Sequence, residues 1–460
     1  MYFLLKRAQE IAAVLKKADE VHIVTHIDAD GITAGAIAQA TIQRLGKTSS
    51  IECVKQLDEL VLKRLKKEGY ELVWFTDLGS SIVDEIPKMT VVVTDHHMCS
   101  KESHLRYHLN PHLFGVDGSF EISGAGVTYL VSKTIDPVNV DLSALAVIGA
   151  CGDLQDRRHC KLVGMNKGFL EDGKTAHVLE CRKDIRYFGR ETRPLPRLLQ
   201  YANDPFLPGL SGREEACVSF LEDLKIRLNH KESARRWIDL SNDERKTILS
   251  ALARLLLMKG FGAALVERMI GDVYLLAREE PGSELHDAKE YATLLNSTAR
   301  YGKHEVGLAV CLGDRGKSLE DARKLLQGHR QNLVESLQFA RDETLQKRTN
   351  VQFFHAGEGI RDTIIGIVTN MMLQDENVDK SMPLLGFVHT ENGDVKVSAR
   401  TTQQLIERGV DLSAALRHAA AAVQGVGGGH DIAAGATIPK GKEEEFLVFV
   451  EQKIRAQLSL

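Results

Sequence analysis

VHIVTHIDADGITAG, residues 21–35, decides the fold class of this 460-residue chain. Its first part is an apolar, β-branched run of strand length, and the acidic residues Asp28 and Asp30 follow directly. An alanine-rich stretch of helical character comes next. A strand that leads straight into a helix is typical of parallel α/β proteins, so the pattern predicts the first unit of such a sheet.

Three further runs repeat this rhythm before about Asp153: IECVKQ (51–56), ELVWFTD (71–77) and TVVVTDHH (90–97). The predicted fold class is therefore α/β, with an N-terminal parallel sheet. Acidic or imidazole side chains stand where the strands end. In open parallel sheets the carboxyl ends of the strands form the ligand crevice, so these side chains should converge. They are His26, Asp28, Asp30, Asp77, Asp95, His96 and His97.

The pattern changes twice in the rest of the chain. Residues 205–285 favour helices, and an amphipathic stretch then opens with Ser318-Leu-Glu-Asp321, a capping-box pattern. From Val351 onward short β-rich runs and a glycine-rich stretch predict a smaller α/β domain. We predict four parts. They are a parallel-sheet domain (1–180), a mainly helical insertion (181–290), a motif with a connecting helix (291–349) and the smaller domain (350–460).

Composition excludes several classes of protein. Lys and Arg number 59 against 63 Asp and Glu, so any nucleic-acid surface must be local. The seven cysteines show no CxxC spacing, which favours reduced thiols in a cytoplasm over disulfides or a structural zinc. The start of the chain lacks the features of a secretory signal, and no run approaches the roughly 18 apolar residues of a membrane span. We expect a cytoplasmic protein without a membrane partner.

The strand-end residues, together with Asp153, suit two divalent ions, Mn first and Mg second. Two such ions can ionise a shared water and neutralise a phosphate under attack, which points to a two-metal hydrolase. A single Asp after a strand is more often a helix cap, and a single His more often a hydrogen-bonded residue. Capping and ordinary hydrogen bonding explain less well an Asp-His-His run and an Asp-Ala-Asp run at one sheet edge, because like charges repel unless they are neutralised.

Six motifs resemble those of the DHH phosphoesterase superfamily, and of its RecJ-like branch in particular. The first four are Thr25-His-Ile-Asp-Ala-Asp-Gly-Ile-Thr33, Thr76-Asp77, Thr94-Asp-His-His97 and Gly152-Asp153. Leu294-Leu-Asn-Ser-Thr-Ala-Arg300 is similar to a RecJ motif, and Gly428-Gly-His-Asp-Ile-Ala-Ala-Gly435 contains a run similar to the Gly-Gly-His motif of the DHHA1 domain. The order of the motifs separates the chain from family II pyrophosphatases. The compact layout with a helical insertion resembles that of archaeal RecJ-like proteins.

The resemblance implies roles for individual residues. The implied metal ligands, with Asp77 as the bridging carboxylate, are His26, Asp28, Asp30, Asp77, His96 and Asp153. His26 departs from the family, because bacterial RecJ enzymes carry Asp there. The implied catalytic residues are His97, Asp95 and His430. The implied nucleic-acid contacts are Asn296, Arg300, Ser398, Arg400, Gly428, Gly429 and His430.

The resemblance further implies a metal-dependent exonuclease that hydrolyses single-stranded DNA or RNA from one end, in replication or repair. Its cleft would lie between the DHH domain and the DHHA1 domain, and the insertion could dock a GINS complex or a repair helicase. Two alternatives stay open: a phosphodiesterase for short substrates such as a nanoRNase, and a non-catalytic replication scaffold. The basic, aromatic-containing segment Cys181–Arg197 suits either a single strand or a solvated loop.

Overall fold

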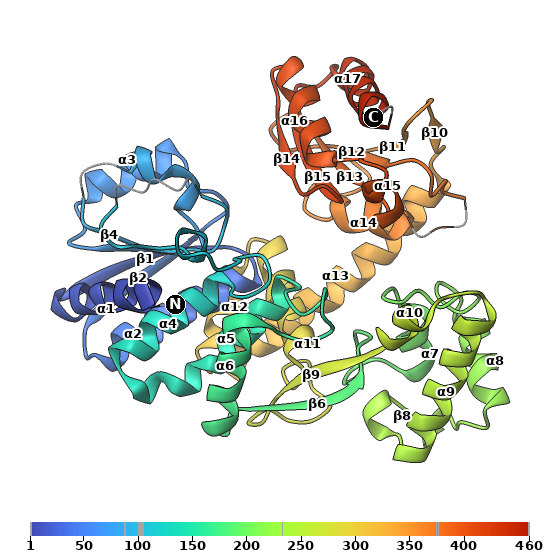
Figure 1. Cartoon of the computed structure of the whole chain (residues 1–460), viewed down its shortest axis with the longest axis horizontal. Helices are drawn as coiled ribbons and strands as arrows, with labels where there is room; N and C mark the ends of the chain where they lie inside the picture. The colour runs from blue at the N-terminus through green and yellow to red at the C-terminus, as the bar shows by residue number, and fades with distance from the viewer. Residues whose placement is uncertain are drawn as a thin grey trace. The chain divides into compact units, whose positions relative to one another are not determined.

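The computed structural model describes residues 2–86, 89–99, 105–231, 233–373, 375 and 377–458. The chain forms two compact units, Met1–Leu326 and Gln327–Leu460 (Figure 1). The four-part division at 180, 290 and 349, and the cleft between the two sheet domains, stay predictions. None of the described helices is long and apolar enough to cross a membrane.

A five-stranded parallel sheet forms the centre of the first unit, in the order β2-β1-β3-β4-β5. This confirms the predicted α/β class. The first strand ends at His26, and the helix α2 begins three residues later, as the opening motif predicts. The strands are β1 (Glu20–His26), β2 (Thr48–Val54), β3 (Val73–Thr76), β4 (Val91–Thr94) and β5 (His108–Leu109).

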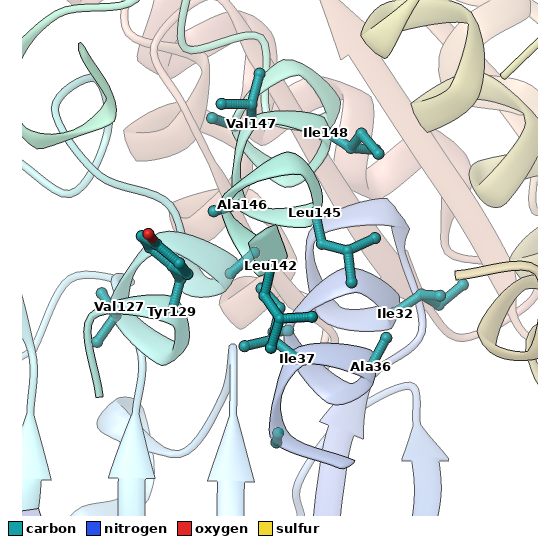
Figure 2. Close-up of a cluster of buried hydrophobic side chains, with 14 of the residues drawn as sticks. Ile32, Ala36, Ile37, Val127, Tyr129, Leu142, Leu145, Ala146, Val147 and Ile148 are labelled. Atoms are coloured by element: carbon teal, nitrogen blue, oxygen red, sulfur yellow. The ribbon is translucent and has the colours of Figure 1, made fainter. Parts of the chain in front are cut away.

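Successive residues of the strands enter two separate cores, one on each face of the sheet. Trp74 and Val92 pack with α1, α2, α4 and α5, whereas Phe75 and Val93 pack with α3. Figure 2 shows the first of these cores between α2, α4 and α5. Helices thus cover both faces and leave the strand ends as the place for a site. The helices are α1 (Tyr2–Lys17), α2 (Ala29–Arg44), α3 (Glu59–Glu68), α4 (Gly124–Ile135), α5 (Ser143–Gly152) and α6 (Gly164–Thr175).

Two antiparallel strands, β6 (Leu179–Ile185) and β9 (Ile270–Leu276), flank the helices of the insertion in the chain. The sequence pattern predicted no strand at either place. The charged residues of β6 conceal its strand character, because most of its middle positions face outward. Helix α9 begins after Ser241 with a capping box to Glu244, as its sequence predicts. The other elements of the insertion are α7 (Leu195–Gln200), α8 (Glu214–Asp223), β7 (Asn229–His230), β8 (Ser233–Ala234), α9 (Asn242–Met258) and α10 (Ala263–Glu267).

The basic segment Cys181–Arg197 has a structural role that neither sequence interpretation included. Arg190 is 1% exposed and donates hydrogen bonds to Asp184 (2.8 Å) and Asp287 (3.1 Å). Arg186 is also buried and lies 3.4 Å from an Asp156 oxygen. These two arginines join the insertion to the sheet domain.

Three helices follow: α11 (Ala288–Arg300), α12 (His304–Cys311) and α13 (Lys317–Asp342). The predicted capping box at Ser318 is wrong. Asp314 caps α13 instead, since its carboxylate accepts hydrogen bonds from the Gly316 N–H (2.8 Å) and the Ser318 hydroxyl (2.6 Å). Asp and Ser are about equally favourable as caps, so sequence alone does not decide between two candidates four residues apart.

The second unit contains a six-stranded mixed sheet in the order β10-β11-β12-β13-β15-β14, which confirms the predicted smaller α/β domain. Helices α16 and α17 pack on one face and α14 on the other. The strands are β10 (Gln346–Lys347), β11 (Gln352–Gly357), β12 (Leu384–His389), β13 (Val395–Arg400), β14 (Val426–Gly429) and β15 (Ala433–Ile438). The helices are α14 (Ile365–Met372), α15 (Gln403–Glu407), α16 (Leu412–Ala422) and α17 (Glu443–Leu458).

Short 3₁₀ helices complete the described elements. They are Ser80–Glu85, Pro111–Phe114, Pro137–Leu142 and Trp237–Asp239.

Candidate metal centre

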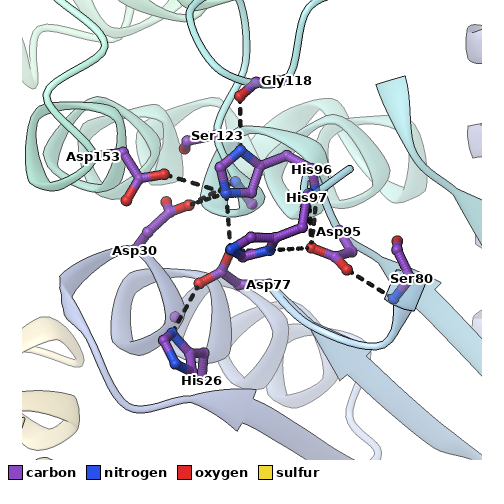
Figure 3. Close-up of polar contacts among 12 residues, drawn as sticks. His26, Asp30, Asp77, Ser80, Asp95, His96, His97, Gly118, Ser123 and Asp153 are labelled. Carbon is purple, nitrogen blue, oxygen red and sulfur yellow. Dashed lines mark hydrogen bonds and ion pairs between the residues drawn. The ribbon is translucent and has the colours of Figure 1, made fainter. Parts of the chain in front are cut away.

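The carboxyl edge of the parallel sheet gathers the residues that the sequence placed at its strand ends (Figure 3). Their ligand atoms form three overlapping groups, each compact enough to hold a metal ion. The groups are His26, Asp28 and Asp77; Asp30, His96 and Asp153; and Asp77, His96 and His97. Asp77 and His96 each belong to two groups, so the groups form one continuous centre.

Asp77 lies at the middle of this centre. Its backbone φ is 59°, a left-handed conformation that is uncommon outside glycine. One carboxylate oxygen lies 3.7 Å from His26 Nδ1 and the other 3.4 Å from His96 Nε2. The second oxygen is buried and accepts no hydrogen bond from a described residue. An acceptor that is buried without a donor costs free energy, so a cation is the partner that this oxygen fits.

Asp30, His96 and Asp153 form the deeper side of the centre. Asp30 accepts hydrogen bonds from the N–H groups of Gly124 (2.6 Å) and Ala125 (3.0 Å), at the start of α4. His96 Nδ1 donates to the Gly118 carbonyl (2.7 Å), which directs Nε2 toward Asp153 at 3.2 Å. This fixes the tautomer that leaves Nε2 free to bind a metal.

Asp28 is both a helix cap and a member of the centre. One oxygen accepts a hydrogen bond from the Gly31 N–H (2.9 Å) and caps α2, while the other lies 3.0 Å from His26 Nδ1. Asp28 therefore caps a helix and also lies among the candidate ligand atoms, so one interpretation of an Asp after a strand does not exclude the other. The geometry also places His26, the departure from the bacterial pattern, among the candidate ligand atoms.

Asp95 orients the neighbouring residue His97. Its carboxylate accepts hydrogen bonds from the Ser80 N–H (2.8 Å) and from His97 Nδ1 (2.8 Å). Burial disfavours its charge, but the hydrogen bond and charge of His97 outweigh burial and lower the pKa of Asp95. The same hydrogen bond raises the pKa of His97 to about 9. The His97 side chain is 55% exposed, so Asp95 holds an imidazole that a substrate can reach.

The charges and donor atoms of the centre fit divalent ions. Burial and the negative charges of Asp30 and Asp28 raise the pKa of Asp77 well above its usual value. Burial and Asp30 likewise raise the pKa of Asp153 to about 8. Four carboxylates crowded in this way repel one another, and a divalent cation relieves the repulsion. Oxygen donors outnumber imidazoles and no thiolate takes part, which fits Mn²⁺ or Mg²⁺.

Gly124 is a member of the centre that sequence reasoning missed. A Cβ atom on Gly124 would lie 2.3 Å from an Asp77 oxygen, so only glycine leaves room for that carboxylate. The one signal in the sequence is the Ser-Gly-Ala-Gly start of α4 (123–126), which is compatible with any capped helix.

We predict that Gly124→Ala weakens Mn²⁺ binding about fivefold or more, measured by calorimetry, because the methyl group displaces Asp77. An overpacking cost of about 1–3 kcal/mol corresponds to a loss of this size. Gly168→Ala is the control, since Gly168 lies in α6 with open space around it. It should bind Mn²⁺ as the parent protein does and unfold at a slightly higher temperature. Unchanged Mn²⁺ affinity in Gly124→Ala would contradict the assignment of Asp77.

Helix α11 brings the fifth motif to this centre. The Asn296 side-chain oxygen accepts a hydrogen bond from the Ala29 N–H (2.9 Å), between Asp28 and Asp30. Burial lowers the pKa of Arg300, and the negative charge of Asp28 partly offsets that shift, so the two groups are electrostatic neighbours. Asn296 and Arg300 therefore lie beside the candidate metal ligands.

The remaining predicted residues lie in the second unit. Arg400 Nη1 donates to the Ser398 hydroxyl (3.0 Å), and the guanidinium lies against Gly366 in the first turn of α14. Ser398 pairs with Gly435, which pairs with Gly428 on the next strand, so these motifs are neighbours in the sheet. His430 is exposed, and its backbone N–H donates to the Ala433 carbonyl. Its catalytic role stays a prediction.

Comparison with known domain families identifies three matching segments. Residues 20–150 match the DHH family, N-terminal domain; residues 187–270 match the DHH-CID domain; and residues 349–456 match the DHHA1 domain. These segments include the candidate metal centre except Asp153, the helical part of the insertion, and the smaller sheet except β10.

Two relatives resemble the chain in sequence. An uncharacterised protein of Methanocaldococcus jannaschii is 30% identical over 472 residues, which cover 99% of this chain and 100% of the relative. The single-stranded-DNA-specific exonuclease RecJ of Bacillus subtilis is 27% identical over 170 residues, which cover 33% of this chain and 22% of that enzyme.

Two solved structures share the fold. RecJ of Thermus thermophilus in complex with Mn²⁺ has a TM-score of 0.59 at 18% identity; the match covers 98% of this chain and 55% of that one. Cdc45 of Entamoeba histolytica has a TM-score of 0.69 at 12% identity, covering 98% and 99% of the two chains. Together with the three domain matches, the motifs and the assembled centre, these likenesses show that the chain belongs to the DHH family, as a RecJ-like protein with a DHHA1 domain.

Proposed function

We propose that this protein is a two-metal phosphodiesterase that removes nucleotides from one end of single-stranded DNA or RNA, in replication or repair. Membership of the family supports a phosphoesterase or a nuclease. The observation that carries the proposal is the Asp77 carboxylate, whose oxygens face two separate groups of candidate ligands. A carboxylate between two cation sites suits in-line cleavage of a phosphodiester bond.

The residues of the centre have distinct proposed tasks. When bound, two divalent ions, Mn²⁺ or Mg²⁺, supply a nucleophile at neutral pH and neutralise charge on the phosphate. The proposed ligands are His26, Asp28, Asp30, Asp77, His96 and Asp153. His97 presents a cationic imidazole to the phosphate, and Asp95 keeps it charged and oriented.

Further residues are proposed to contact the strand. Arg400 and Ser398 form a fork that suits a phosphate, because a guanidinium can donate two parallel hydrogen bonds to its oxygens. Asn296 and Arg300 would contact the nucleotide beside the metal ligands. We propose that His430 approaches the scissile phosphate. We also propose that the insertion docks a GINS complex or a repair helicase.

The glycine run of the second unit gives a prediction. A Cβ atom on Gly429 would lie 2.7 Å from the Ala433 carbonyl, and its φ is 132°, whereas Gly428 has open space around it. We expect Gly429→Ala to lower the free energy of unfolding by about 1–3 kcal/mol. Gly428→Ala should keep the parent stability but weaken strand binding severalfold in fluorescence anisotropy, because its methyl group obstructs close approach of the strand. Parent affinity in Gly428→Ala would remove Gly428 from the binding surface.

The proposal is tested with strands of DNA and RNA labelled in turn at each end and incubated with Mn²⁺. A ladder that shortens from one end establishes an exonuclease and gives its direction and its sugar preference. Cleavage of dinucleotides alone would favour the short-substrate phosphodiesterase. Cleavage of no substrate would favour the scaffold, a candidate that the likeness to the Cdc45 fold keeps open.

A further inference from the structure

The loop that fixes His96 also carries an aromatic ring. The Gly118 carbonyl accepts hydrogen bonds from His96 Nδ1 (2.7 Å) and from Gln155 Nε2 (2.8 Å). Gln155 Nε2 also donates to the Ile122 carbonyl (3.2 Å), so both ends of the segment 118–122 are fixed to the metal centre. Phe120 is the aromatic residue of this segment and is only half-buried.

Arg158 lies over this ring. Its guanidinium carbon is 5.0 Å from the centroid of Phe120, within the range of a cation–π interaction. Arg158 is exposed, and the sequence from Asp153 to Arg158 connects it directly to a candidate metal ligand. Arg157 and Lys161 are further exposed basic residues of the same segment, and Arg157 lies 3.7 Å from Asp204.

The helical insertion holds the arginine segment in place. Arg268 donates hydrogen bonds to the carbonyls of Arg157 (3.1 Å) and Arg158 (3.4 Å), and forms a bidentate pair with Asp204 (2.8 and 2.7 Å). Arg268, which follows α10 in the insertion, thus fixes the backbone of Arg157 and Arg158.

We propose that Phe120 and Arg158 form a binding platform for a nucleotide that lies beyond the scissile bond. The inference rests on the proposed function and deepens it. A base stacks on the pair formed by the half-buried Phe120 and the exposed Arg158, and the guanidinium pairs with the adjoining phosphate. This combination accepts any base and any sugar, as a nuclease that moves along a strand requires. A dinucleotide has no nucleotide beyond the two that flank its scissile bond, so a platform for such a nucleotide favours longer strands.

The test compares four variants of the full chain: Phe120→Leu, Arg158→Ala, Arg158→Lys and the control Lys167→Ala, an exposed lysine on α6. Leucine keeps apolar bulk where alanine could disturb the fold. Affinity for an oligonucleotide of about 20 residues is measured by fluorescence anisotropy without metal. Stacking of one base contributes roughly 1–3 kcal/mol, so Phe120→Leu and Arg158→Ala should each weaken binding about tenfold. Arg158→Lys should lose less than Arg158→Ala, and Lys167→Ala should bind as the parent protein does.

Turnover gives the second readout. The two disruptive variants should raise KM for the long strand about tenfold and leave kcat/KM for a Mn²⁺-dependent dinucleotide hydrolysis within about twofold of the parent value. Unchanged affinity for the long strand, or equal losses on long and short substrates, would overturn the platform. A parent protein that hydrolyses nothing would refute the proposed function alone, because the anisotropy series would still decide whether Phe120 and Arg158 bind the strand.

Discussion

Asp77→Asn is expected to reduce Mn²⁺-dependent hydrolysis of single strands at least a thousandfold. The Asp77 carboxylate lies between the His26 and His96 imidazoles and accepts no hydrogen bond at its buried oxygen from a described residue. An amide has one acceptor oxygen instead of two anionic ones, so it cannot serve two cation sites. Lewis-acid stabilisation of a phosphoryl transition state contributes several kcal/mol, and each 1.36 kcal/mol is a factor of ten in rate.

The same variant should keep its fold. Because burial and the charges of Asp30 and Asp28 raise the pKa of Asp77, a neutral side chain of the same shape suits the metal-free protein. We expect its metal-free Tm to match or exceed the parent value and the Mn²⁺-induced rise in Tm to disappear. Asp172→Asn is the control, since Asp172 pairs with Lys133 on α4, away from the centre. Residual hydrolysis near the parent rate in Asp77→Asn would contradict the assignment.

Arg190→Met is expected to have the largest effect on stability. Its guanidinium is buried among Asp184, Glu191 and Asp287, at distances of 2.8, 3.3 and 3.1 Å. Methionine fills part of the volume but leaves these carboxylates without their cation. Removal of one partner from a buried ion pair costs about 3–5 kcal/mol, which should appear as a reduced free energy of unfolding in urea.

The position of Asp287 extends this effect to the site. Asp287 caps α11, the helix that carries Asn296 to the Ala29 N–H. Arg190→Met should therefore also weaken substrate binding, although Arg190 contacts no candidate ligand. Arg197→Met is the matched control, because Arg197 is exposed and pairs with an exposed Glu214 at 3.3 Å. That pair should contribute less than about 1 kcal/mol. Equal stability losses in both variants would show that the buried network is not what stabilises the insertion.

The sheet and the centre were predictable from the sequence because their signals are local. Each of β1, β3 and β4 is a short apolar run, and polar residues follow it immediately, as in Asp77 after Thr76. A parallel sheet places such ends at one edge, so His26, Asp77 and His96 could be brought together without coordinates. Asp77 belongs to two of the candidate ligand groups, and its place as a bridging carboxylate stays a prediction.

The features that sequence reasoning missed depend on contacts between distant residues. Gly124 matters only because Asp77 lies against it, and the carbonyl of Gly118 matters only because His96 does. The charged segment 181–197 indicates a loop from its sequence, whereas β6 pairs with the distant β9 and Arg190 is buried beside Asp287, 97 positions away. The site roles of Ser398, Arg400 and His430 depend on contacts with a bound strand, which no local sequence signal specifies.

Calorimetric titration of the metal-free protein with Mn²⁺ tests the central claim most directly. The arrangement of Asp77 between two ligand groups predicts two bound ions per chain, and none or one weakly bound ion in Asp77→Asn. The absence of any Mn²⁺ binding to the parent protein would contradict the account, and the non-catalytic scaffold would then be the better description.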